Sequence, residues 1–74
     1  ITFDLPENAQ VRLMVYDVSG RLVKTLVDRA VEAGSHVAEW NGTDDAGHCV
    51  QSGIYFYEMK AGAYHSQRQM TLLK

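Results

Sequence analysis

Apolar and polar residues alternate with a period of two through most of this chain, and no window of a dozen residues carries a helix-like apolar stripe. Residues 10–17 are the clearest case, because Val11, Leu13 and Val15 share one face of an extended segment while Met14 falls on the other. We expect the branched residues to lie in the core. The pattern predicts an all-β protein.

Turn signals divide the chain into about six or seven short strands. Pro6 ends the first strand, Ser19-Gly20 predicts a two-residue hairpin turn, and Gly34 breaks the pattern within a connection over residues 29–35. Ala61-Gly62-Ala63 is expected to close a second hairpin. The expected strands span residues 1–5, 10–17, 21–28, 36–40, 54–60 and 64–73. This spacing is typical of a small antiparallel β-sandwich.

The length and charge of the chain exclude several classes of protein. Its 74 residues suffice for one domain with a small core, so residues 1–74 are expected to form a single domain. A net charge of -2 offers no basic field for nucleic acid. No apolar run approaches the roughly 20 residues that cross a bilayer, so membrane insertion is not expected. The chain starts at Ile1, and we expect it to be part of a longer protein.

Aromatic residues are the remaining core candidates. Trp40 ends the expected strand 36–40, and its large side chain is predicted to be the centre of the core. Tyr55 and Tyr57 lie on the segment most prone to form a strand and are expected to pack in the sheet. A surface platform of tryptophan and tyrosine that stacks on sugar rings is the alternative, so a glycan stays open as a minor partner.

The polar loop after Trp40 contains weak candidates for calcium ligands. Asn41, Asp44 and Asp45 would bring oxygens together on one short segment, as a hard cation requires. Their spacing does not match an EF-hand, and turns capped by Gly42 and Gly47 explain the same residues better. We therefore predict no metal and no cofactor.

Catalysis is not expected either. Cys49 is the single cysteine, so no internal disulfide can form, and neither it nor the adjacent His48 has an obvious partner at ligand or catalytic spacing. The serines lie at turns or on a strand with no recognisable base beside them. The sequence predicts a domain that is not an enzyme.

Several segments together carry a family resemblance. The chain reads Leu5-Pro6, Val11-Arg12-Leu13, Tyr16-Asp17-Val18-Ser19-Gly20-Arg21, Trp40-Asn41-Gly42-Thr43-Asp44-Asp45-Ala46-Gly47 and Ser52-Gly53-Ile54-Tyr55-Phe56-Tyr57. In this order they resemble the flagellar hook-capping (FlgD-like) immunoglobulin-like domain and the closely similar type A C-terminal sorting domains of the type IX secretion system. The resemblance implies an immunoglobulin-like (fibronectin III-like) sandwich that is the C-terminal module of a longer secreted bacterial protein.

The last residues favour the sorting domains. The chain ends in Arg68-Gln69-Met70-Thr71-Leu72-Leu73-Lys74, which is similar to the final strand that closes them. The resemblance implies that Arg68, Met70, Leu72 and Lys74 contact a partner. That partner would be the outer-membrane secretion machinery or neighbouring domains of the parent protein, and the parent would reach the cell surface or medium through the periplasm. An assembly domain of the hook-capping type and an accessory carbohydrate-binding module of a secreted hydrolase are the alternatives.

Overall fold

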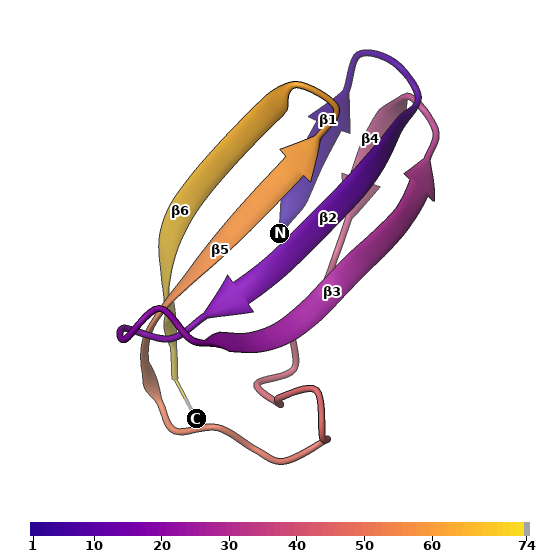
Figure 1. The fold of residues 1–74 in the computed structure, drawn as a ribbon. Helices are drawn as coiled ribbons and strands as arrows, with labels where there is room; N and C mark the ends of the chain where they lie inside the picture. Colours follow the sequence, from indigo (N-terminus) through magenta and orange to yellow (C-terminus); the bar gives the residue numbers. More distant parts are fainter. Residues whose placement is uncertain (74) are drawn as a thin grey trace.

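The computed structural model describes residues 1–73, which form an all-β sandwich of six antiparallel strands in two sheets (Figure 1). The larger sheet has the strand order β3-β2-β5-β6, and the smaller sheet pairs β1 with β4. The strands are β1 (Thr2–Leu5), β2 (Ala9–Tyr16), β3 (Leu22–Val31), β4 (Gly34–Val37), β5 (Gly53–Ala61) and β6 (Tyr64–Leu72). The predicted fold class is confirmed. Residues 1–73 contain no helix with the length and hydropathy to cross a bilayer.

The turn between β2 and β3 differs from the predicted two-residue hairpin. Residues 17–21 connect the strands, and the Asp17 carboxylate organises them by accepting hydrogen bonds from the backbone N–H groups of Ser19 (2.9 Å) and Arg21 (3.0 Å). Gly20 adopts a φ of 86°, a left-handed conformation that glycine tolerates without strain. The prediction located the glycine correctly but missed the aspartate, whose side chain supports a longer turn.

Strand β3 is longer than predicted, because pairing with β2 continues to Val31 opposite Ala9. The predicted connection over residues 29–35 is therefore wrong, and Gly34 begins β4 instead of lying in a loop. Met14 pairs with Thr25 while Leu13 pairs with Val27, so Leu26 is an extra residue in β3. This β-bulge lets both Leu26 and Val27 pack against the core, which strict alternation would not permit.

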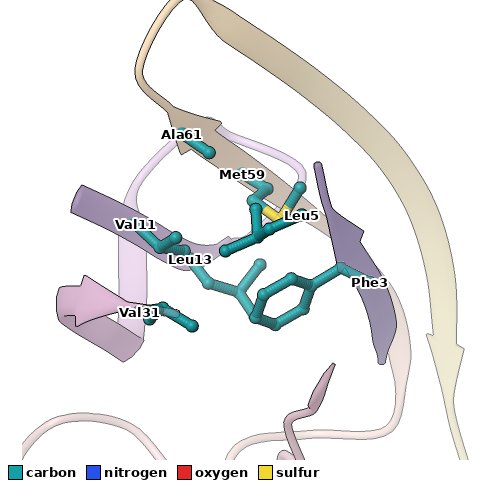
Figure 2. Close-up of a cluster of buried hydrophobic side chains, with 7 residues drawn as sticks. All are labelled: Phe3, Leu5, Val11, Leu13, Val31, Met59 and Ala61. Carbon is teal, nitrogen blue, oxygen red and sulfur yellow. The ribbon is translucent and has the colours of Figure 1, made fainter. Parts of the chain in front are cut away.

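The core lies between the two sheets, and β2 supplies its centre. Val11, Leu13 and Val15 have no exposed surface, which confirms the face chosen from the sequence. Figure 2 shows the main cluster, in which side chains of β1 point toward those of β2, β3 and β5. Its members are Phe3, Leu5, Val11, Leu13, Val31, Met59 and Ala61. Met14 is also buried, although it lies on the outer face, where the Tyr16 hydroxyl donates to its sulfur at 3.6 Å.

Trp40 is not the centre of the core, and that prediction is corrected. It follows the end of β4, is half-buried, and packs edge-to-face on Tyr55 with ring centroids 5.0 Å apart. A half-buried indole needs an acceptor for its Nε1–H, and the carbonyl of Thr43 provides one at 2.8 Å. Trp40 therefore lies at the end of the sandwich and not at its centre. Tyr55 is buried as expected, whereas Tyr57 is only half-buried and packs at the margin of the cluster.

The predicted hairpin between β5 and β6 is present, but Ala61 belongs to β5 and the turn is one residue shorter than the predicted Ala61-Gly62-Ala63. Its turn is the two residues Gly62 and Ala63, and Ala61 pairs with Tyr64. Gly62 has a φ of 59°, whereas the φ of Ala63 is not positive, because only glycines among residues 1–73 have positive φ. A type II′ turn requires this combination at its two central residues. This turn fixes the register of the whole of β6.

Candidate functional site

The side chains of β6 separate into two faces. Arg68, Met70 and Leu72 pair across the sheet with Tyr57, Tyr55 and Gly53. Directly paired residues share a face, and Tyr55 and Tyr57 point into the sandwich, so these three interaction candidates lie on the inner face. The outer face is uniformly polar and exposed, and it consists of His65, Gln67, Gln69 and Thr71. Lys74, the fourth candidate, lies outside the residues that the structure describes.

The inner face of β6 stays accessible to solvent. Tyr64 is 53% exposed, Arg68 is exposed, and Met70 and Leu72 are half-buried. On the inner face of β2, by contrast, Val11, Leu13 and Val15 are completely buried. The smaller sheet therefore covers β2 and its neighbours but does not seal β6.

A groove lies between β1 and β6, which we call the β1–β6 groove. Its volume is about 480 Å³, and it is lined by Ile1, Thr2, Phe3, Asp4, Tyr57, Met59, Tyr64, Ser66 and Arg68. A second hollow of about 290 Å³ shares Asp4, Met59 and Tyr64 with the groove and continues it toward the adjacent turns. The two hollows together form an elongated depression along the open side of the sandwich.

The charged side chains that line the β1–β6 groove are Asp4 and Arg68. Among residues 1–73, the Arg68 guanidinium has no ion pair and no hydrogen bond. The Asp4 carboxylate is already engaged, because Ser35 on β4 donates its hydroxyl hydrogen to it. Phe3 and Leu5 point into the core, so the Asp4 side chain extends from the outer face of β1. Arg68 is thus a cation available to a binding partner.

The loop over residues 38–52 uses its acidic side chains as turn acceptors. Asp44 Oδ1 accepts from the backbone N–H groups of Ala46 (3.0 Å) and His48 (2.9 Å). Asn41 Oδ1 accepts from the Thr43 hydroxyl at 2.6 Å. These are the Asx-type interactions that the flanking glycines favour.

Asp45 connects the same loop to the edge of the larger sheet. Its backbone N–H donates to the Val23 carbonyl at 3.0 Å, and its Oδ1 accepts from the Thr25 N–H at 3.1 Å. The Oδ1 atoms of Asp44 and Asp45 therefore accept hydrogen bonds from different backbone N–H groups. In the described part of the chain, no group of three His, Cys, Asp or Glu side chains could hold a metal ion. The prediction that the weak calcium candidates Asn41, Asp44 and Asp45 hold no metal stays a prediction.

Two carboxyl groups at this end of the sandwich are held in their ionised forms. Hydrogen bonds from the Ser19 hydroxyl and the Arg21 N–H lower the pKa of Asp17. The backbone N–H of His48 is the main cause that lowers the pKa of Asp44. Both aspartates border a hollow of about 350 Å³. Because the donors belong to the loops themselves, the carboxylates stabilise turns and leave little capacity for a ligand.

The four tyrosines do not form one platform for sugars. Tyr16 lies on the outer face of the larger sheet, whereas Tyr55, Tyr57 and Tyr64 lie on the inner face. The Tyr55 hydroxyl donates to the Gln51 carbonyl at 2.7 Å, which fixes that ring against the long loop. Tyr57 and Tyr64 line the β1–β6 groove together with Phe3, whose ring is buried in the core.

The sequence reading missed two features of this region. It did not place Arg68 in a groove, although counting in steps of two from the Gly62-Ala63 turn would have put Arg68 on the same face as Tyr57. It also missed the contact of Asp45 with β3, for which no local signal exists, because Asp45 and Thr25 are 20 residues apart.

Comparison with known proteins assigns most of this structure to one family. Residues 1–64 match the family model of the FlgD Ig-like domain. The matched range includes β1 to β5 and ends at the first residue of β6. A search of curated proteins finds no match to this chain.

Proposed function

The chain belongs to the family of FlgD Ig-like domains, and from this membership we propose that it is a non-catalytic sorting module of a secreted bacterial protein. The outer-membrane machinery of type IX secretion would recognise the folded module. The parent protein would cross the periplasm first and reach the cell surface or medium afterwards.

The position of β6 is the observation that supports this role. The family match ends where β6 begins, so the interaction candidates Arg68, Met70 and Leu72 all lie beyond it. They also share one accessible face of an edge strand. An edge strand offers unpaired backbone groups as well as side chains to a partner, which suits recognition by strand pairing.

A non-catalytic role agrees with the way the acidic residues are used. Asp17, Asp44 and Asp45 all accept hydrogen bonds from backbone N–H groups of nearby turns or strands. The core cluster between the sheets consists of apolar side chains, none of which can act as an acid, base or nucleophile. These features favour a role of the domain in binding a partner.

One observation favours a second role, that of an assembly domain of the hook-capping type. Three apolar side chains at the end of the larger sheet are exposed: Val18 by 73%, Leu22 by 50% and Ile54 by 45%. Val18 and Ile54 border the same hollow. A neighbouring domain or subunit that packs here would cover them.

An export assay separates the two roles. We would express the parent protein with and without residues 1–74 in a bacterium with an intact type IX system, and would also fuse residues 1–74 to an unrelated carrier. Sorting predicts that the deletion traps the parent in the periplasm and that the fused carrier is exported. Unchanged export of the deleted protein would refute sorting. Co-purification of neighbouring subunits and retention on insoluble polysaccharide would then test assembly and glycan binding.

A further inference from the structure

The β1–β6 groove has an unpaired strand edge along one side. The N-terminal ammonium of Ile1 donates to the Ala38 carbonyl and the Ala38 N–H donates to the Ile1 carbonyl, both at 2.8 Å, which identifies the two residues as a hydrogen-bonded pair that continues the β1–β4 ladder. Such pairs alternate along an antiparallel ladder, so Phe3 also directs its backbone groups toward β4. Thr2 and Asp4 direct theirs the opposite way, and both residues line the groove.

The other side of the groove is the inner face of β6. Ser66 lies opposite Met59, and because serine is small, a side chain that enters here can approach the methionine. Tyr57 and Tyr64 provide apolar ring surface on either side. Arg68 adds a positive charge without a partner among residues 1–73. The groove therefore combines unpaired backbone groups, apolar surface and one cation.

We propose that the β1–β6 groove binds an extended segment of a partner protein, which adds to β1 as a third strand of the smaller sheet. The segment carries an acidic side chain that pairs with Arg68 and an apolar side chain two residues away that packs on Met59. Residues two apart share a face of a strand and lie about 7 Å from one another, which matches the spacing of Arg68 and Ser66 along β6.

Two arguments identify this occupant. The N–H and C=O groups of Thr2 and Asp4 are complementary to an extended backbone, which pairs with a strand edge at a spacing of roughly 4.8 Å. The guanidinium of Arg68, which has no ion pair within the described residues 1–73, selects a carboxylate, with which it forms charge-assisted hydrogen bonds. This inference does not rest on the sorting role, because binding is measured on the chain itself and export is not involved.

The test uses two synthetic heptapeptides with blocked ends. The first, Thr-Val-Thr-Glu-Thr-Val-Thr, places valine and glutamate on one face, and the second has lysine in place of glutamate. Each is titrated to millimolar concentration into the isotope-labelled chain, and backbone amide NMR shifts are followed. We expect the glutamate peptide to shift the amides of Thr2 and Asp4 and to bind about three- to tenfold more tightly than the lysine peptide.

Single substitutions in the chain test which groups cause the tighter binding of the glutamate peptide. Arg68→Gln should remove the difference between the peptides, whereas Arg29→Gln, a change at an exposed arginine on β3, should preserve it. Thr2→Pro removes an N–H that faces the groove, a position where a strand tolerates proline, and should weaken both peptides. Equal binding of the peptides, or shifts confined to other strands, would overturn the proposal. Shifts at Thr2 on raising the concentration of the chain alone would overturn it in favour of a second copy.

Discussion

Leu13 is the largest fully buried side chain among residues 1–73, so its truncation is expected to destabilise the fold strongly. Leu13 has no exposed surface, and it pairs with Val27 on one side and Met59 on the other. The Leu13→Ala change removes buried methyl groups and leaves a cavity, which costs about 2–5 kcal/mol in well-packed cores. A domain of this size has a total stability of about 4–11 kcal/mol. One substitution is thus expected to remove at least about a fifth of the free energy of unfolding.

Thermal and urea unfolding, followed by circular dichroism, measure this effect. For a loss of about 3 kcal/mol the melting temperature should fall by roughly 12–24 °C, because 1 kcal/mol corresponds to about 4–8 °C in a domain of this length. Leu73→Ala is the matched control, since it makes the same chemical change at a residue that is 84% exposed. We expect the control to stay within about 0.5 kcal/mol of the wild type.

The comparison can contradict the burial argument. If Leu13→Ala unfolds at the temperature and urea concentration of the wild type, Leu13 is not at the centre of the core. A large loss in both variants would instead mean that the segment after β6 packs on the sandwich.

Three further predictions concern the long loop. Trp40→Phe loses the hydrogen bond to Thr43 and should cost about 1 kcal/mol in urea unfolding; an unchanged midpoint would contradict the contact. Asp45→Ala should accelerate hydrogen exchange at the Thr25 amide, measured by NMR, and unaltered protection there would exclude the role of Asp45 at the β3 edge. Asp44 has a lowered pKa, so its contribution to stability is present above the ordinary value of 3.8 and is lost as pH falls below it. Melting temperatures from pH 5 to 2.5 should therefore fall less steeply in Asp44→Asn, and parallel curves would refute the linkage.

The fold could be predicted wherever local pattern and local turn chemistry agree. The alternation in β2 identified the buried set Val11, Leu13 and Val15, and the glycine at position 62 identified the β5–β6 hairpin. Predictions failed where distant pairing decides the outcome. Strand β3 continues to Val31 because β2 lies beside it, although the local sequence indicates a connection. The position of Trp40 was predicted wrongly, because the size of a side chain indicates that it is buried but not in which part of the sandwich it lies.

The candidate site was predictable only in part. The sequence identified Arg68, Met70 and Leu72 through a resemblance to a terminal strand, and their spacing of two residues explains why they share one face. The groove itself depends on β1 and β6 approaching each other from opposite ends of the chain, which no local pattern encodes. The lack of an ion pair at Arg68 among residues 1–73 likewise depends on the packing of the two sheets and not on its sequence neighbours.

Export of a carrier fused to variants of residues 1–74 tests the proposed sorting role most directly. One variant changes the inner face of β6 through Arg68→Gln, Met70→Thr and Leu72→Thr, and its control changes the outer face through Gln67→Thr and Gln69→Thr. Circular dichroism must first show that both variants are folded. Sorting through the inner face predicts that the first fusion stays in the periplasm while the second reaches the medium or cell surface. Export of a folded inner-face variant at the wild-type level would contradict it.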